Sequence, residues 1–233
     1  MNKESFLTTT LIAHRGVHYK YMENSIKAFQ EAIKRNYIIE LDVHITKDNK
    51  IVVFHDNNLK RLAGVAKNIE ELNYKEILKI ISIPTIEEVL KIVNGKVPLI
   101  IETKILNNVG KLEKILSNIL SKYKGKVAIQ SFSYKSLEWF KNNNPKYPRG
   151  YLINSITSHN ILIKHILSIK KLNNIIKPTY LGINLDYINN KIIKKLRKEY
   201  LIIGYTINNQ EEYNKYKNKT DNLICNIKKY PYK

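Results

Sequence analysis

The chain has 233 residues, of which 43% are hydrophobic and 26% are charged, and these proportions suit a globular protein with one sizeable core. Its single cysteine excludes an intramolecular disulfide, and its longest apolar runs are far too short to span a bilayer. The formal net charge of +20 favours anionic partners, but the lysines are spread along predicted helix faces, so we expect no nucleic-acid partner.

The N-terminal segment MNKESFLTTTLIAHRG lacks the apolar stretch that follows the basic residues of a secretory signal. Together with the single cysteine, this predicts a cytoplasmic protein. The positive charge allows weak association with an anionic membrane surface. No heptad seam or exposed apolar stripe predicts an oligomeric state.

Eight short segments rich in Ile, Leu and Val predict buried parallel strands. In chain order they are residues 10–14, 37–43, 97–103, 126–131, 149–153, 180–185, 201–207 and 221–226. Most are separated by segments with helical spacing of apolar residues, clearest at 24–36, 110–123, 133–145 and 189–200. This alternation predicts an α/β fold, a single-domain (β/α)8 TIM barrel over residues 1–233, with a doubly wound open sheet as the alternative.

One segment interrupts the alternation of strands and helices. The stretch IIELDVHITKDNKIVVFHD, residues 38–56, contains two strand-like runs joined by the polar turn TKDNK. Such a pattern is typical of a β-hairpin. We therefore expect a hairpin extension after the second barrel strand.

Carboxylates occur inside these strands, where burial is costly. Glu40 and Asp42 are two residues apart, so in a strand they share a face, and one would take up a proton unless a cation holds both. Glu102 ends the next barrel strand, and the active groups of such barrels gather at the carboxyl ends of strands. Three carboxylates from two neighbouring strands favour one hard cation, Mg²⁺ or Ca²⁺.

Two histidines also stand at predicted strand ends. His14 ends the first strand and is followed by Arg15, while His55 ends the hairpin. Either one alone is usually structural, but two imidazoles beside an acid pair can divide proton transfer between them. Arg15 and Lys104 add positive charge on either side, and the planar fork of arginine suits a phosphate. These groups together predict a site that cleaves a phosphate ester.

Other polar residues near these motifs are assigned less specific roles. Asp56 could orient the imidazole of His55, but we favour a turn cap. Gln130 could form a polar wall of the site or satisfy backbone groups, and both interpretations stay open. Four further histidines are given no catalytic role: His18 and His44, expected to be structural or at the rim, and His159 and His165, on a predicted helix.

The motifs together resemble the glycerophosphodiester phosphodiesterase family. The matching stretches, in family order, are AHRGVHYKYMENSIKAFQEAI, IELDVHITKDNKIVVFHDNNLKRLAG, IPTIEEVL, IIETK, QSFS and GYTINN. They cover almost the whole chain, and the first two are highly specific together. The resemblance implies a (β/α)8 barrel with these site residues: the acid–base pair His14 and His55, the metal ligands Glu40, Asp42 and Glu102, and the phosphate contacts Arg15 and Lys104.

The resemblance also implies an activity. The family converts small-molecule glycerophosphodiesters to sn-glycerol 3-phosphate and an alcohol with one divalent cation. The usual proposal is attack of the glycerol 2-hydroxyl on phosphorus, followed by hydrolysis of the cyclic phosphate.

The chain departs from the family pattern at a few positions. Tyr205 stands in GYTINN where tryptophan is common, and Cys225-Asn226 replaces a more usual Thr-Asp in the last strand. The stretch between His55 and Glu102 is short, so we expect a reduced insertion and a more open mouth. These departures leave the head-group preference open.

Two other functions are kept as alternatives. The same chemistry could act on membrane lysolipids, as in a lysophospholipase D, because the charge is strongly positive and the insertion is short. A barrel that only binds an anionic ligand or nucleic acid is the alternative from another class. Such a binding barrel would not need both histidines, which speaks against it.

Overall fold

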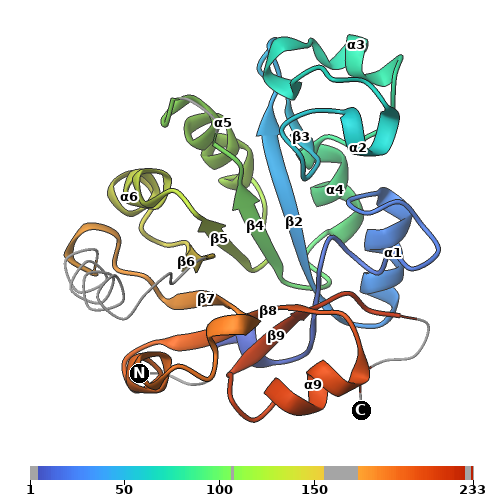
Figure 1. Ribbon diagram of the computed structural model, residues 1–233. Helices are drawn as coiled ribbons and strands as arrows, with labels where there is room; N and C mark the ends of the chain where they lie inside the picture. Colours follow the sequence, from blue (N-terminus) through green and yellow to red (C-terminus); the bar gives the residue numbers. More distant parts are fainter. Residues whose placement is uncertain (1–4, 106–107, 155–172, 229–231, 233) are drawn as a thin grey trace.

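The computed structural model describes residues 5–105, 108–154, 173–228 and 232. Eight parallel strands form a closed barrel (Figure 1). They are β1 (Ile12–Ala13), β2 (Ile38–Ile45), β4 (Leu99–Thr103), β5 (Val127–Ser131), β6 (Arg149–Ile153), β7 (Tyr180–Asn184), β8 (Leu201–Ile207) and β9 (Asn222–Cys225). Because β1 pairs with both β9 and β2, no edge remains in the parallel sheet, which confirms the TIM barrel and excludes the open sheet.

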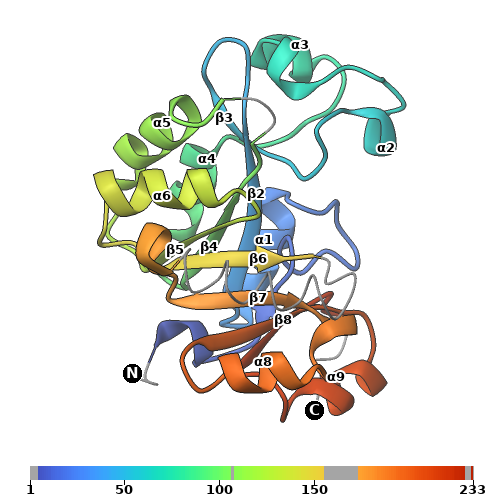
Figure 2. The ribbon, with the colours of Figure 1, turned by 60° about the vertical axis from the view of Figure 1, so that its left-hand side comes forward.

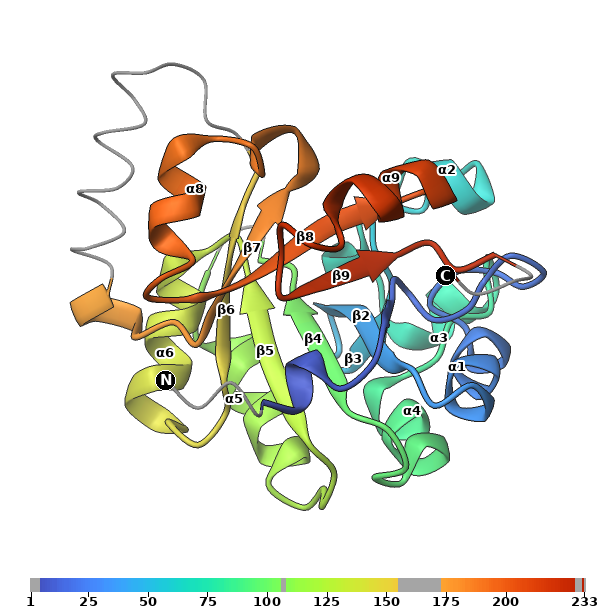
Figure 3. The ribbon, with the colours of Figure 1, turned by 90° about the horizontal axis from the view of Figure 1, so that it is seen from below.

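Helices surround the strands, as the view from below shows (Figure 3). They are α1 (Ile26–Lys34), α4 (Ile86–Val93), α5 (Lys111–Leu120), α6 (Tyr134–Asn143), α8 (Lys191–Leu196) and α9 (Gln210–Tyr216). Side-chain caps begin several of them: the Ser25 hydroxyl accepts from the Ala28 N–H, and Ser133 caps α6 in the same way. The helix expected around His159 and His165 lies outside the described residues.

The predicted hairpin after the second barrel strand is present. Strand β3 (Ile51–Val53) pairs antiparallel with β2, with Val43 opposite Val53. The insertion that follows contains α2 (Lys60–Ala63), the 3₁₀ turn η2 (Ile69–Glu71) and α3 (Tyr74–Leu78). Figures 1 and 2 show the hairpin, α2 and α3 together beyond the end of β2. The insertion has its own apolar cluster, formed by Val52, Phe54, Leu59, Ile69, Leu72, Ile77 and Ile83.

Alternate residues of each strand face opposite sides of the barrel wall. One set packs outward against the helices, and the other fills the barrel interior. The interior set includes Leu7 of the 3₁₀ turn η1 (Phe6–Thr8) and consists of Leu7, Ile12, Ile38, Ile100, Ala128, Tyr180, Leu201, Ile203 and Ile224. Glu40 and Glu102 follow Ile38 and Ile100 on this face, so the carboxylates lie above an apolar plug.

Among the described helices, none combines the length and the apolar character needed to cross a membrane.

Arg149 ties together backbone segments at the start of β6. Its side chain is buried and donates to the carbonyl oxygens of Pro145, Tyr147, Ile176 and Lys177, at 2.7 to 3.3 Å. Arginine suits this position because its fork of donors reaches several acceptors at once.

We expect Arg149→Lys to lower the free energy of unfolding by roughly 2–4 kcal/mol, because an ammonium cannot reach all four carbonyls and each buried acceptor left without a donor costs about 1–3 kcal/mol. Chemical denaturation would measure the loss. The control is Arg197→Lys, since Arg197 is more exposed and pairs with Asp221, and it should cost less than about 1 kcal/mol. Equal losses in the two variants would contradict this role for Arg149.

Candidate active site

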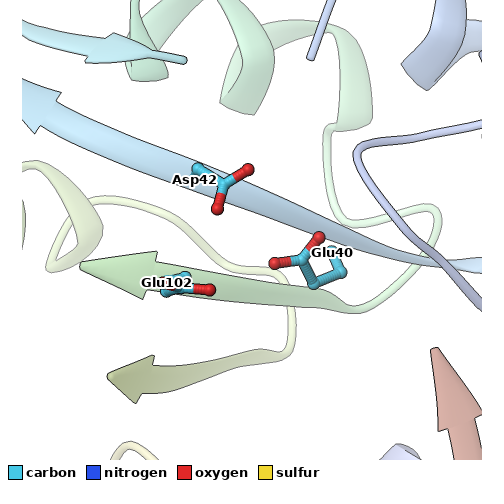
Figure 4. Close-up of side chains that lie close together, drawn as sticks. All are labelled: Glu40, Asp42 and Glu102. Carbon is cyan, nitrogen blue, oxygen red and sulfur yellow. The ribbon is translucent and has the colours of Figure 1, made fainter. Parts of the chain in front are cut away.

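Three carboxylates from neighbouring strands meet at the carboxyl end of the barrel. Glu40 and Asp42 project from β2, and Glu102 projects from β4 directly beside Asp42 (Figure 4). All three are buried, and one oxygen of each lies within 4.8 Å of the others. The pleat of β2 and the register between β2 and β4 therefore bring together the residues that the sequence singled out as cation ligands.

The pKa values of the three carboxyl groups show that full ionisation of the cluster is unfavourable. Burial, together with the neighbouring Asp42 and Glu102, raises the pKa of Glu40 well above its usual value. Burial likewise raises the pKa of Glu102 to about 7, although Lys104 opposes the shift. Burial also acts to raise the pKa of Asp42, but Lys104 and Arg15 outweigh it and hold that pKa below its usual range. An all-oxygen set that retains protons near neutrality fits a hard divalent cation, which would offset the repulsion.

The two predicted phosphate contacts lie against these carboxylates. Lys104 Nζ is 3.0 Å from Asp42 Oδ1 and 2.5 Å from Glu102 Oε1. Arg15 Nε is 3.5 Å from Asp42 Oδ2, and within the described part of the chain this buried donor has no hydrogen-bond partner. Arg15 therefore retains an N–H that an anionic oxygen could accept from.

A tight turn after β1 places Arg15. Arg15 and Gly16 have φ values of 53° and 78°, and a Cβ at Gly16 would lie 2.8 Å from the backbone carbon of Ala28. Only glycine permits this close approach to α1. The turn also aims the backbone N–H of Arg15 at Glu40 Oε2, which accepts it at 3.1 Å.

His14 is buried beside the cluster and is held in one tautomer. Burial lowers the pKa of His14 to about 4, with Arg15 adding to the effect, so the imidazole is neutral at pH 7. Its Nδ1 lies 2.7 Å from Asn226 Oδ1, and the Asn226 amide donates to Asn208. Since an amide oxygen only accepts, Nδ1 carries the proton and Nε2 keeps a free lone pair.

Asp56 corrects an expectation from the sequence. It was expected to cap a turn, but its Oδ1 lies 2.6 Å from His55 Nδ1. The reason is Arg61, whose Nε donates to Asp56 Oδ2 at 2.6 Å and turns the carboxylate toward the imidazole. Burial lowers the pKa of His55 and Asp56 partly opposes this, so the ring is neutral with Nε2 free. The buried His44 contacts the His55 backbone carbonyl through Nε2 at 3.2 Å.

The contacts of Arg61 extend this arrangement into an ion-pair chain. Arg61 also binds Glu23, and Glu23 binds Arg15 Nη1 at 2.8 Å. These ion pairs thus link His55 to Arg15 through side chains from the loop after β3, from α2 and from the loop before α1. Sequence reasoning ranked the orienting role of Asp56 second to a turn cap and missed Arg61 and Glu23, because only tertiary contacts bring these residues together.

Two amides complete the site. Asn24 Nδ2 donates to Asp42 Oδ2 at 2.9 Å, and Gln130 Nε2 donates to Glu40 Oε1 at 3.1 Å. Gln130 therefore belongs to the polar wall of the site, the interpretation that the sequence left open. Asn226 and Asn24 were not expected here, although each adjoins a strand end or a motif that the sequence did single out.

A small cavity of about 30 Å³ opens among these groups at the carboxyl end of the barrel. Its lining consists of His14, Glu40, Glu102, Gln130, Phe132, Leu152, Tyr205, Thr206 and Ile224. His55 is not in the lining, but it lies close enough to the cluster for the Asp42 carboxylate to act to raise the pKa of His55, against the larger effect of burial. A larger groove of about 670 Å³ lies outside the barrel, lined by residues of α4 and α5, and it has no such convergence of acids and histidines.

Comparison with known proteins identifies the family. The model of the "Glycerophosphoryl diester phosphodiesterase family" matches residues 14–222. The Bacillus subtilis (strain 168) protein YhdW is 30% identical over 217 residues, which cover 86% of this chain and 87% of YhdW. The human "Lysophospholipase D GDPD1" is 36% identical over 140 residues, covering 52% of this chain and 43% of that protein, so the chain spans less than half of it.

Solved structures agree with this result. The Thermotoga maritima glycerophosphodiester phosphodiesterase is 26% identical, with a TM-score of 0.76 over 93% of this chain and 94% of that chain. An Oleispira antarctica phosphodiesterase, solved in complex with the product sn-glycerol-3-phosphate, is 21% identical and shares the fold, with a TM-score of 0.82 over 96% of this chain and 95% of that chain. The family expected from the motifs is confirmed: the chain belongs to the glycerophosphoryl diester phosphodiesterase family.

Proposed function

We propose that this protein hydrolyses small glycerophosphodiesters to sn-glycerol 3-phosphate and an alcohol, using one divalent cation, Mg²⁺ or Ca²⁺, held by Glu40, Asp42 and Glu102. The single observation that carries the proposal is the buried cluster of these three carboxylates at the carboxyl end of the barrel. Membership of the family supports the reaction class. The binding of sn-glycerol-3-phosphate by the Oleispira antarctica phosphodiesterase supports the product, through a shared fold only.

Positive charge in the site supports an anionic substrate. Lys104 and Arg15 lie against the three carboxylates, and a divalent cation would add two positive charges there. These charges would attract the oxygens of a phosphodiester.

The chain's own residues account for binding and proton transfer. When bound, the cation would polarise the phosphoryl oxygens. Arg15 would donate its unpartnered Nε–H to a phosphate oxygen, with Lys104 adding positive charge. Both histidines present a free Nε2, because Asn226 and Asp56 occupy their Nδ1 atoms.

The two imidazoles then divide the proton transfers. One, in its neutral form, would take the proton of the glycerol 2-hydroxyl at Nε2 as that oxygen bonds to phosphorus. The other, after taking up a proton from solvent at Nε2, would give it to the departing head-group oxygen as its bond to phosphorus breaks. Water would open the resulting cyclic phosphate with the proton transfers reversed.

Hydrolysis of membrane lysolipids is a second candidate function. Phe132 lines the cavity and is 43% exposed, and Tyr134 beside it is 39% exposed. These rings form an apolar rim against which an acyl chain could pack. The similarity to the human lysophospholipase D and the net charge of +20 also favour this candidate.

The activity can be tested with glycerophosphocholine and Mg²⁺ or Ca²⁺, following sn-glycerol 3-phosphate. We expect product formation that a chelator abolishes and added cation restores, because the carboxylate cluster should lose its neutralising charge. Product that forms equally well with chelator would contradict cation dependence. Product only from lysolipid vesicles would favour the second candidate, and ligand binding without turnover of any diester would favour a non-catalytic barrel.

Replacement of either histidine should separate catalysis from folding. We expect His14→Ala and His55→Ala each to lower turnover by about 10²–10⁴-fold, the usual contribution of a general acid or base, with an unchanged circular dichroism spectrum. His18→Ala is the control, since the hydrogen bonds of His18 go to the backbone carbonyls of His14 and Gly16 and its ring only packs edge-on against that of His14. This variant should lose far less activity. Near-normal turnover in both His14 and His55 variants would refute their proposed roles.

The pH dependence of kcat/KM should report the Asp56 contact. The Asp56 carboxylate raises the pKa of His55 against the effect of burial, so Asp56→Asn should lower that pKa and move the His55-dependent limb of the profile to lower pH. Asp48→Asn removes a carboxylate from the hairpin turn, away from the site, and should leave the profile in place. A wild-type profile in Asp56→Asn would contradict the orienting role.

A further inference from the structure

One row of residues crosses four neighbouring strands at the level of the carboxylate cluster. In the strand register, Glu102 lies beside Gln130, Gln130 beside Gly150, and Gly150 beside Tyr180. The side chain of Tyr180 is fully buried and belongs to the apolar cluster of the barrel interior. A tyrosine hydroxyl in such surroundings needs a hydrogen-bond partner, which Tyr180 cannot find on its own strand.

Gly150 lets the tyrosine ring reach past its neighbouring strand. A Cβ at Gly150 would lie 2.1 Å from Tyr180 Cζ and 2.4 Å from its hydroxyl oxygen, so the ring occupies the space of a side chain on β6. The Tyr180 hydroxyl thereby reaches β5 and donates to Gln130 Oε1 at 3.1 Å. Glycine is needed at position 150 because any side chain would displace this ring.

The direction of the hydrogen-bond chain follows from its end at Glu40. Gln130 Nε2 donates to Glu40 Oε1 at 3.1 Å, and the Glu40 carboxylate, once ionised to hold a cation, can only accept. The amide oxygen of Gln130 must therefore face Tyr180, which has to donate. Burial, with the charges of Glu40 and Glu102, raises the pKa of Tyr180 well above its usual value, so the hydroxyl keeps the proton that it donates.

Glu40 depends on these hydrogen bonds for its orientation more than Asp42 and Glu102 do. Lys104 pairs with Asp42 and Glu102, whereas among the described residues no basic side chain forms a salt bridge with Glu40. Its two oxygens accept from neutral donors, Gln130 Nε2 and the Arg15 N–H. Neutral donors hold the carboxylate plane in place while leaving its charge available to a cation.

We propose that Tyr180, acting through Gln130, is a positioning residue that holds the Glu40 carboxylate in the orientation for cation binding. The inference rests on the proposed function only for the cation at this site. The hydroxyl of Tyr180 fixes which way the Gln130 amide faces. Without it, the amide can turn its oxygen toward Glu40, where two acceptors would repel each other.

Calorimetric titration of the full chain with Mg²⁺ and Ca²⁺ tests the proposal independently of turnover. Outer partners of ligands typically contribute 10–100-fold to metal affinity, so Gln130→Met should weaken binding by about that factor. Tyr180→Phe should weaken binding too, by a smaller factor. Their double variant should bind no more weakly than Gln130→Met alone, since the hydroxyl acts only through the amide.

Tyr147→Phe is the matched control. Tyr147 is also buried, but its hydroxyl has no hydrogen-bond partner in the part of the chain that the structure describes. This variant should keep the wild-type affinity. Melting temperatures without cation would show that all variants are folded.

Wild-type cation affinity in Tyr180→Phe would overturn the proposal. It would also be overturned if the losses of affinity in the two single variants added fully in the double variant, because independent packing defects would give that result. Absence of cation binding by the wild type would overturn the cation site and the proposal together. The expected affinities in a protein that hydrolyses no glycerophosphodiester would support the positioning role while refuting the proposed function.

Discussion

Burial of three carboxylates at one end of a closed barrel is the constraint on which the rest of the site depends. Ionised acids in such surroundings are stable only when positive charge or hydrogen-bond donors approach them. Lys104 forms ion pairs with both Asp42 and Glu102, while Glu40 accepts hydrogen bonds from two neutral donors. The turn after β1, the loop after β4 and the tyrosine beneath the site can all be understood as responses to this constraint.

Burial at this end of the barrel also sets the protonation of the two histidines. Burial lowers the pKa of His14 and of His55, and the positive charge of Arg15 lowers both further. A neutral ring needs a defined tautomer to act as a proton acceptor, and Asn226 defines it for His14 and Asp56 for His55. Asp56 in turn depends on Arg61, so the short insertion contributes to the site as well as covering β3.

Much of this arrangement could be predicted because it follows from local periodicity. Residues two apart in a strand share a face, which placed Glu40 and Asp42 together, and parallel strands end at one edge, which placed Glu102 beside them. Asp56 was assigned wrongly because its position in a turn suggested a local cap. Its actual partners are an adjacent imidazole and an arginine on α2, whose direction no turn pattern encodes.

The sequence by itself determined the barrel, its hairpin and the side chains that could carry the chemistry, because strand and helix periods and strand ends are local properties. Tertiary structure alone decided how those side chains are held. Asn226 reaches His14 across 212 residues of chain, and Tyr180 reaches Gln130 across a strand that has glycine at the crossing point. Such contacts depend on barrel closure, register and side-chain direction, and these become defined only when distant strands pack together.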